Sequence, residues 1–285
     1  MTGALLADLS TFRFWRHFTN RTLAAIGVLA IALGLYDVLF PGDVADNVRP
    51  VFVLVVVAAV IYGFIASWPR PIEASYSAPN TRIRVLKGDL FDQDGHLVVG
   101  TCDTFDTLVP DVIAPSSVQG QFLNKVFGGR LDELDRQIAD ALRRIEPCGE
   151  VAKPGKTVRY PVGTVAVLRE NRRKHFLVAY TEMSPSNEAR GTADGVWRSL
   201  LSLWGVIGRE ANGETVSMPV IGGGQARLSQ VLPVQDSIRF IALSFMLASR
   251  HEKICDELNI VILPADFDRL DRLQIQSFLN SLKAS

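Results

Sequence analysis

The chain has 285 residues with 30 basic and 30 acidic side chains, so its formal net charge is zero. This balance excludes a binder of nucleic acid polymers whose affinity rests on phosphate neutralisation, unless the charges are segregated. The three cysteines, Cys102, Cys148 and Cys255, are widely spaced and form no CxxC. Their number and spacing exclude a disulfide scaffold and argue against a structural zinc site, and we predict no metal site.

Charge is distributed unevenly along the chain. Residues 1–69 carry four basic and four acidic groups, whereas residues 70–285 carry 26 of each. The positive mean hydropathy of +0.18 therefore comes from the N-terminal part. The chain thus divides into a nearly uncharged segment and a balanced, charge-rich one.

The N-terminal part contains two apolar runs, residues 22–40 and 51–68. As helices they would each span roughly 27–28 Å, close to the hydrocarbon thickness of a bilayer. A polar connection with proline at both ends, residues 41–50, separates them. The alternatives are a signal peptide or two buried core helices, but no small-x-small cleavage site follows the first run. We predict a transmembrane hairpin over residues 22–68.

The basic residues that flank the spans predict their orientation. Cytoplasmic flanks of membrane spans are rich in Lys and Arg. The connection contains only Arg49, and the outer flanks contain Arg13, Arg16, Arg21, Arg70, Arg82, Arg84 and Lys87. We therefore expect a multi-pass protein of the cell inner membrane, with residues 1–21 and the C-terminal part in the cytoplasm. Asp37 lies within the first span, where a carboxylate hints at function or snorkels to the interface.

Residues 69–81 contain three prolines and read as a linker. After it, strand and helix patterns alternate, which predicts an α/β/α sandwich with a mixed sheet over residues 82–285. The expected strands are 83–88, 96–101, 164–168, 175–180, 214–220 and 257–263. The expected helices are 117–129, 130–145, 188–210, 233–250 and 266–283.

Three segments at the ends of expected strands could carry chemistry. Asp89 follows Gly88 after the first strand, and a polar loop over residues 101–107 follows the second. Residues 221–225 read Ile-Gly-Gly-Gly-Gln, and glycines at a strand end let backbone N–H groups approach a diphosphate. Each segment taken alone can also be an ordinary turn or loop.

The order of these three segments resembles that of macro domains, which bind ADP-ribose in an α/β/α fold. Residues 106–109 and 113–120, together with the hairpin, make the resemblance more specific. The whole chain is similar to the transmembrane macro-domain effector (ThsA-like) of the Thoeris antiphage defence system.

The resemblance implies a ligand site at matching positions. Asp89 would contact the adenine amine with Leu90 beside it, and Ser117 and Gly120 would lie across the phosphates. The distal ribose would be surrounded by Thr101, Cys102, Asp103, Thr104 and Asp106. The pyrophosphate would be wrapped by Ile221, Gly222, Gly223, Gly224 and Gln225.

The resemblance implies a ligand sensor that needs no cofactor. Hydrolytic macro domains have Val-Asn-Ala-Ala-Asn where this chain has Val99-Gly-Thr-Cys-Asp103, so the ribose-orienting asparagine is absent. The implied ligand is an ADP-ribose derivative, histidine-linked, made by a TIR-domain partner. The implied action is homo-oligomerisation and disruption of the lipid bilayer in abortive infection. Two alternatives remain: a membrane-tethered ADP-ribosyl hydrolase, with Asp103 or Asp106 positioning water, and a scaffolding membrane protein.

Overall fold

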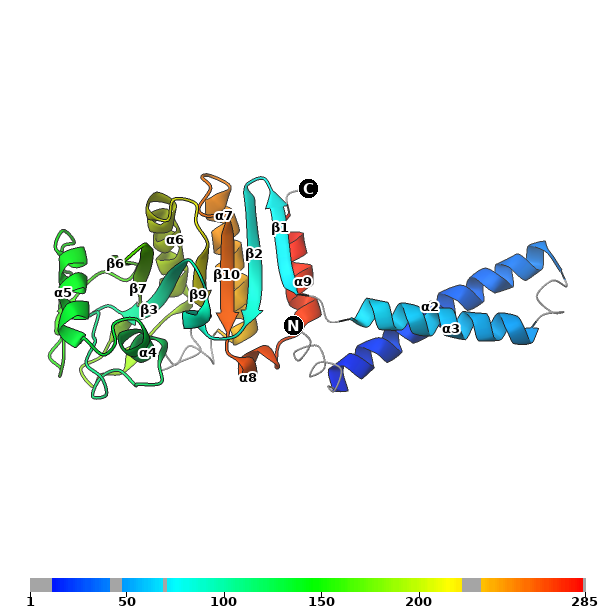
Figure 1. Ribbon diagram of the computed structural model, residues 1–285, viewed down its shortest axis with the longest axis horizontal. Coiled ribbons are helices and arrows are strands. Elements are labelled where there is room, and N and C mark those ends of the chain that lie inside the picture. Colours follow the sequence, from blue (N-terminus) through cyan, green and yellow to red (C-terminus); the bar gives the residue numbers. More distant parts are fainter. Residues whose placement is uncertain (1–11, 42–47, 69–70, 222–231, 284–285) are drawn as a thin grey trace. The chain divides into compact units, whose positions relative to one another are not determined.

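The chain forms two compact units, Met1–Arg70 and Pro71–Ser285, called here the hairpin unit and the sheet unit (Figure 1). The computed structural model describes residues 12–41, 48–68, 71–221 and 232–283. Each unit is treated separately below.

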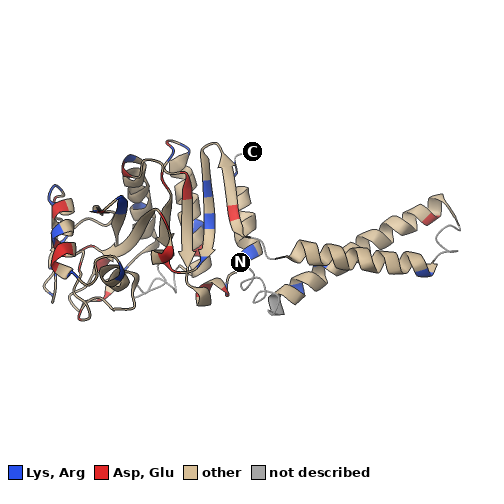
Figure 2. Cartoon of the chain, in the orientation of Figure 1, with Lys and Arg blue, Asp and Glu red and all other residues tan. Residues whose placement is uncertain are grey.

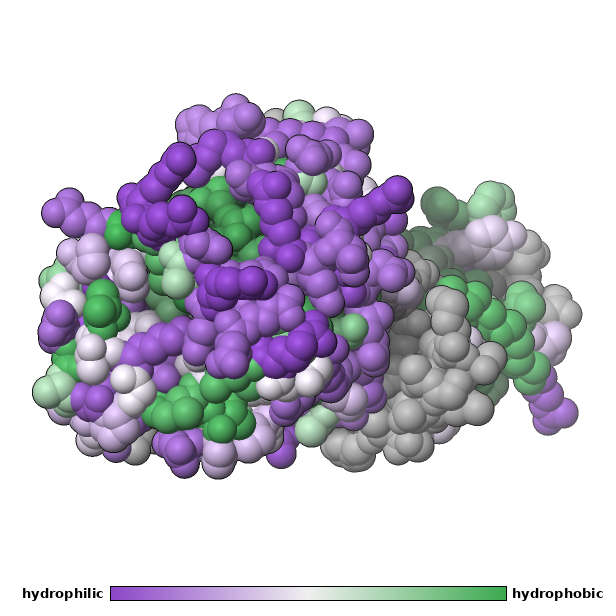
Figure 3. All heavy atoms as spheres, turned by 60° about the vertical axis from the view of Figure 1, so that its left-hand side comes forward, coloured by the Kyte–Doolittle hydropathy of each residue, from purple (hydrophilic) through white to green (hydrophobic). Residues whose placement is uncertain are grey.

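The hairpin unit consists of two packed helices, α2 (Phe12–Leu39) and α3 (Val48–Ser67). Both are long and apolar enough to cross a membrane, and they contain the two expected spans almost entirely. Large apolar side chains such as Leu23, Val28 and Val53 are exposed on them. Figure 2 shows few charged residues along these helices, and Figure 3 shows their apolar surface in green. A surface of this kind is suited to lipid.

Small residues set the close contact between the two helices. Ala59 and Gly63 are the buried residues of α3. A Cβ atom added at Gly63 would lie 2.0 Å from Oγ1 of Thr22, which is itself buried on α2. The hydrogen of glycine therefore permits a helix approach that any larger side chain would prevent.

The sheet unit is built on one mixed sheet in the order β1-β2-β10-β9-β3-β7-β6, with the short β8 paired to β7. Strands β2, β10, β9, β3 and β7 are parallel, and β1, β6 and β8 are antiparallel to their neighbours. The strands of this sheet are β1 (Ile72–Ser77), β2 (Asn80–Lys87), β3 (His96–Cys102), β6 (Val165–Glu170), β7 (Arg173–Met183), β8 (Ala189–Arg190), β9 (Val216–Pro219) and β10 (Glu257–Ile262). A separate pair joins β4 (Gly149–Glu150) to β5 (Val158–Arg159).

Helices cover both faces of the sheet, as Figure 1 shows. One face packs against α4 (Val118–Lys125) and α5 (Leu131–Leu142). The other packs against α6 (Ala193–Glu210), α7 (Val234–Ser249) and α9 (Arg272–Ser281). A short η1 (Leu90–Asp92) follows β2, and α8 (Pro264–Phe267) follows β10.

The two cores arise from the alternation of side chains along the central strands. Val98 of β3 and Val178 of β7 join the core beneath α6 and α7, whereas Val99 and Leu177 join the core beneath α4 and α5. Successive side chains of a strand point to opposite faces, so a continuous apolar run indicates a strand covered on both sides. The predicted α/β/α sandwich with a mixed sheet is confirmed.

Three expected elements differ from the structure. Residues 72–77 form the edge strand β1 rather than a linker, because Ile72, Ala74 and Tyr76 alternate into the core. The expected helix 188–210 begins only at Ala193, where Thr192 caps it, and β8 precedes it. The expected helix 266–283 is broken at residues 268–271 into α8 and α9, with Asp271 as the cap of α9.

Candidate ligand-binding site

A cavity of about 490 Å³ lies across the carboxyl ends of four neighbouring parallel strands. Residues 261–263 and Asp266 line it at the β10 end, and residues 218–221 line it at the end of β9 and directly after that strand. Gly100, Thr101 and Cys102 line it at β3. At the β7–β8 end the lining residues are Val178, Tyr180, Thr181, Met183 and residues 187–189. In open sheets with parallel strands, ligands bind at this edge of the sheet.

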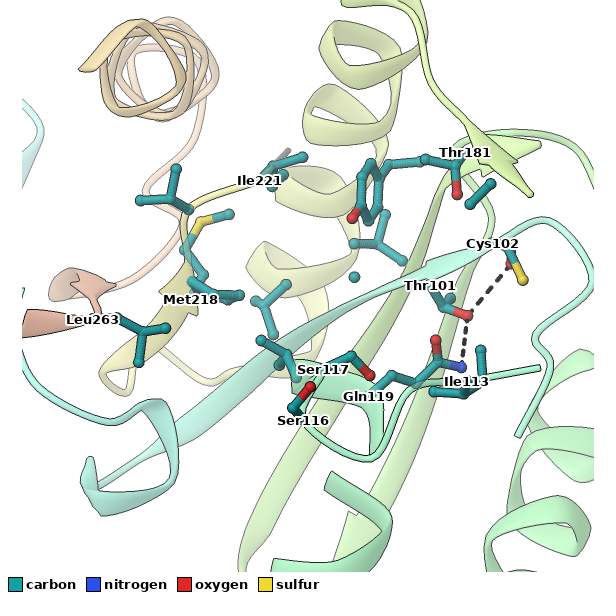
Figure 4. A pocket seen from close by; sticks show the side chains of 18 of the residues that line it. Thr101, Cys102, Ile113, Ser116, Ser117, Gln119, Thr181, Met218, Ile221 and Leu263 are labelled. Carbon is teal, nitrogen blue, oxygen red and sulfur yellow. Dashed lines mark hydrogen bonds between the residues drawn. The ribbon is translucent and has the colours of Figure 1, made fainter. Parts of the chain in front are cut away.

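Figure 4 shows the cavity from close by. Met218, Ile221 and Leu263 lie on one side, and Thr181 and Cys102 lie on the other. Gln119 of α4 closes part of the wall, because its Nε2 donates to Oγ1 of Thr101 at 3.2 Å and to the carbonyl oxygen of Asp106. The lining is mainly apolar at the β10 and β9 side, where Asp266 is a charged exception, and it is more polar at the β3 and β7 side.

Four of the expected site residues line this one cavity: Thr101, Cys102, Ser117 and Ile221. The hydroxyl of Ser117 caps α4 by accepting from the Gly120 N–H at 3.0 Å. The carbonyl oxygen of Ile221 accepts from the Ser237 hydroxyl at 2.6 Å. Segments that are far apart in sequence thus meet at this cavity.

Asp103 is buried and engaged by the protein itself. Its Oδ2 pairs with Nε of Arg159 at 2.6 Å, and its Oδ1 accepts from the Met183 N–H at 2.8 Å. The hydrogen bond to Asp103 raises the pKa of Arg159, so this guanidinium group stays charged. Neighbouring Thr104 is also buried, with its Oγ1 3.2 Å from Sγ of Cys102.

Asp106 is likewise buried and has an even fuller set of partners. Its carboxylate pairs with the buried ammonium group of Lys153. It also accepts from the N–H groups of Thr107 at 3.0 Å and Lys156 at 3.0 Å. Asp103, Thr104 and Asp106 are absent from the cavity lining and instead hold the loops behind it.

The structure places Asp89 and Leu90 outside the cavity lining. Asp89 caps η1 by accepting from the Phe91 N–H at 2.9 Å and forms an ion pair with Lys125 of α4. Burial acts to raise the pKa of Asp89, but the hydrogen bonds from Lys125 and Phe91 outweigh it and the pKa lies below 3.8. Leu90 is buried in a small apolar cluster with Leu97 and Val261.

Two further expectations concern glycines. Gly120 serves packing, because a Cβ atom there would lie 2.4 Å from the carbonyl oxygen of Ala114. The expected pyrophosphate loop, Gly222, Gly223, Gly224 and Gln225, lies outside the described residues, and only Ile221 of that segment is placed. Within the described ranges, no group of three or more His, Cys, Asp or Glu could hold a metal ion.

The sequence-based prediction missed several residues that line the cavity. Gln119 is the second residue of α4, and Tyr180 lies within a strand whose sequence is typical of a buried strand. Asp266 lines the β10 end from α8, which was expected to be part of a longer helix. A glycine inside a strand pattern, here Gly100, is the one sequence signal that could have pointed to a close approach at this place.

The sheet order, the helices on both faces and the cavity at the strand ends define the class of protein as a macro domain. A family model described as "Thoeris protein ThsA, Macro domain" matches residues 83–263, more than half of the chain. The chain belongs to this family.

Solved structures with a similar fold include two of the Oceanobacillus iheyensis macrodomain. One has MES bound, with a TM-score of 0.47, 12% identity and coverage of 74% of this chain and 99% of that chain. The other is with ADP, with a TM-score of 0.45, 10% identity and coverage of 75% and 96%. The Trypanosoma brucei macrodomain in complex with ADP-ribose has a TM-score of 0.43, 13% identity and coverage of 73% and 72%. A search of curated proteins finds no match.

Proposed function

We propose that the sheet unit binds an ADP-ribose derivative in the cavity at the strand ends. The observation that carries this proposal is that, in a chain of this family, the residues lining the cavity change from mainly apolar to more polar along the sheet. Apolar side chains at β10 suit a base. Ile221 lines the cavity, and the glycine-rich sequence that follows it, which lies outside the described residues, is of a composition that suits a pyrophosphate. The N-terminus of α4, whose Ser117 and Val118 line the cavity, adds a positive helix end that favours an anion.

We keep Asp89 as the proposed acceptor for the adenine amine. This role requires its carboxylate to exchange Lys125 for the amine of the ligand. In the structure described here its carboxylate is paired with Lys125. Its side chain is 30% exposed, so the pair is accessible and salt-screened and the interaction is worth at most about 1 kcal/mol. A ligand amine could therefore displace Lys125 at low cost.

The domain is proposed to sense its ligand and not to hydrolyse it. A hydrolase would need Asp103 or Asp106 to orient water. Both carboxylates are buried and already accept from Arg159 and Lys153 respectively, as well as from backbone N–H groups. Freeing Asp106 would leave the buried ammonium group of Lys153 without its partner, which is costly. Freeing Asp103 would break its ion pair with the partly exposed guanidinium group of Arg159.

The hairpin unit is proposed to span the cell inner membrane with both chain termini in the cytoplasm. The orientation rests on Arg16 and Arg21 at one outer flank and Arg70 at the other, against Arg49 in the connection. Basic residues of β2 do not contribute to this argument, because they pair within the sheet unit. The pairs are Arg82 with Glu257, Arg84 with Glu73 and Glu257, and Lys87 with Asp268.

The remaining steps of the proposal link the two units. A TIR-domain partner would make the signal, a histidine-linked ADP-ribose, during phage infection. Binding would favour a homo-oligomer whose hairpins together disrupt the bilayer, because two helices per chain are too few to line a pore. The ligand can drive this change only if it binds the active assembly more tightly than the resting one.

The proposal is tested by calorimetry of the full chain in detergent micelles with ADP-ribose and with histidine-linked ADP-ribose. We expect saturable binding of both, tighter for the conjugate, and recovery of the conjugate unchanged after long incubation. Absence of binding would refute the sensing function. Conversion of the conjugate into ADP-ribose would instead support the hydrolase.

A further inference from the structure

The ring of Tyr180 lines the cavity in a position that depends on a glycine of the neighbouring strand. Tyr180 belongs to β7, and Gly100 of β3 pairs with Val178, two residues before it. A Cβ atom at Gly100 would lie 2.4 Å from Cε1 of Tyr180 and 3.0 Å from Cδ1. Carbon atoms do not approach so closely, so any other residue at position 100 would displace the ring. Gly100 therefore makes room for the tyrosine in the cavity.

Among the residues that the structure describes, no hydrogen bond involves the hydroxyl of Tyr180. Of the other polar groups that line the cavity, Thr101 accepts from Gln119 and Cys102 contacts Thr104, whereas Oδ1 of Asn187 also has no partner among the described residues. Burial, with a smaller contribution from Cys102, raises the pKa of Tyr180 to about 12. The phenol is thus protonated at neutral pH and keeps a donor for a molecule in the cavity.

The position of Tyr180 in the sheet indicates which part of a ligand it meets. Along the sheet the order is β10, β9, β3, β7. If the base lies at β10 and the pyrophosphate follows β9, the group beyond the pyrophosphate lies over β3 and β7. Tyr180 is at that end, on the face that also carries Val98 and Val178.

We infer that Tyr180 is a ligand-binding residue whose hydroxyl donates a hydrogen bond to an oxygen of the distal ribose. This inference rests on the proposed function. It assigns to Tyr180 the recognition of the part that distinguishes ADP-ribose from ADP. A neutral phenol suits a ribose hydroxyl, because it donates without adding charge beside the pyrophosphate.

The test compares binding of ADP and of ADP-ribose by the full chain in detergent micelles. In Tyr180→Phe only the hydroxyl is lost, so we expect about three- to tenfold weaker binding of ADP-ribose. The affinity for ADP should change by less than about twofold, because ADP lacks the distal ribose that the hydroxyl contacts. The matched control is Tyr160→Phe, since Tyr160 packs on the opposite core, outside the cavity lining, and its loss should change neither affinity.

Equal ADP-ribose binding by Tyr180→Phe and the unchanged chain would overturn the inference while leaving the proposed function in place. Equal weakening of ADP and ADP-ribose would also overturn it, because the hydroxyl would then contact the shared part. Failure of the unchanged chain to bind either nucleotide would refute the proposed function itself. Gly100→Ala is a second variant, and we expect it to weaken ADP-ribose binding by displacing the ring.

Discussion

Asp106 and Lys153 form a buried ion pair that holds the loop after β3 to residues 151–157. Their side chains are 1% and 0% exposed, and the carboxylate has further N–H donors. Asp106→Asn would leave the ammonium group buried beside a neutral amide. We expect a loss of about 3–5 kcal/mol in the free energy of unfolding of the sheet unit. Urea unfolding of the full chain in micelles, followed by tryptophan fluorescence, measures it.

The control is an exposed pair on the same unit. Lys87 and Asp268 pair at 2.8 Å, with side chains 30% and 52% exposed. Asp268→Asn should cost less than about 1 kcal/mol, because solvent screens the pair. Similar losses in the free energy of unfolding for the two variants would show that burial does not increase the contribution of the Asp106–Lys153 pair to stability.

The pair between Lys125 and Asp89 predicts a pH dependence. The pKa of Asp89 lies below 3.8: burial raises it, but Lys125 and the Phe91 N–H lower it more. A group whose pKa is lower in the folded than in the unfolded protein stabilises the fold at pH values above its unfolded-state pKa. This stabilisation is lost as the pH falls through the folded-state pKa. Lys125→Met should therefore raise the Asp89 pKa, measured by NMR titration of its carboxyl carbon. An unchanged pKa would show that Lys125 is not the cause.

For single residues, the sequence predicts which side chains follow a strand better than it predicts what those side chains bind. Asp103 and Asp106 follow a buried strand, as ligand-binding carboxylates do. Their partners come from about fifty residues later in the chain, Arg159 from β5 and Lys153 from the connection between β4 and β5. No local pattern reveals such a partner. Tyr180 was missed for a similar reason, since only the pairing of β3 with β7 places it beside Gly100.

At the scale of elements, β1 shows how the sheet unit begins before its expected boundary. The hydroxyl of Tyr76 on β1 donates to the Leu279 carbonyl oxygen of α9 at 2.8 Å. Tyr76→Phe should lower the free energy of unfolding by about 1 kcal/mol, because one buried hydrogen bond is lost and an acceptor is left unpaired. Urea unfolding measures the effect, and no change would mean that β1 contributes nothing through this contact.

The same tyrosine predicts an alkaline effect. Burial raises the pKa of Tyr76 to about 12 from 10.0. A raised pKa gives stability that is complete below the unfolded value and is lost as pH rises towards the folded one. The unchanged chain should therefore lose stability between pH 10 and pH 12 more steeply than Tyr76→Phe. Parallel alkaline unfolding curves for the two would contradict this.

Glycines of the hairpin provide a matched pair of variants. Gly63→Val would place a side chain where Oγ1 of Thr22 lies 2.0 Å from the Cβ position, so α2 and α3 must separate. Gly27→Val is the control, because nothing lies within 4 Å of its Cβ position. We expect distances between spin labels on α2 and α3, in nanodiscs, to increase by several ångströms only for Gly63→Val. An equal distance in both variants would refute the close contact.

The elements that periodicity predicted well are those with strong patterns. Central strands such as β3 and β7 are continuous apolar runs, and α5 and α6 carry clear apolar faces. Strand β1 was missed because its buried positions include a small alanine and prolines flank it. The break between α8 and α9 was missed because apolar residues continue through it, with Leu270 buried in the same core.

At the scale of the whole molecule, the chain combines a unit suited to lipid with a unit of the macro-domain class. Charge distribution alone predicts this division, since the first 69 residues carry few charges. The proposal requires the ligand to bind one assembly state more tightly than another.

The most direct test of this account uses the full chain reconstituted in liposomes that contain a self-quenched dye. We predict that histidine-linked ADP-ribose, added on the side of the sheet unit, releases the dye in a concentration-dependent manner. Adenosine monophosphate should release none. Release that is the same without the conjugate, or no release at concentrations where calorimetry shows binding, would contradict the claim that this chain converts nucleotide binding into membrane disruption.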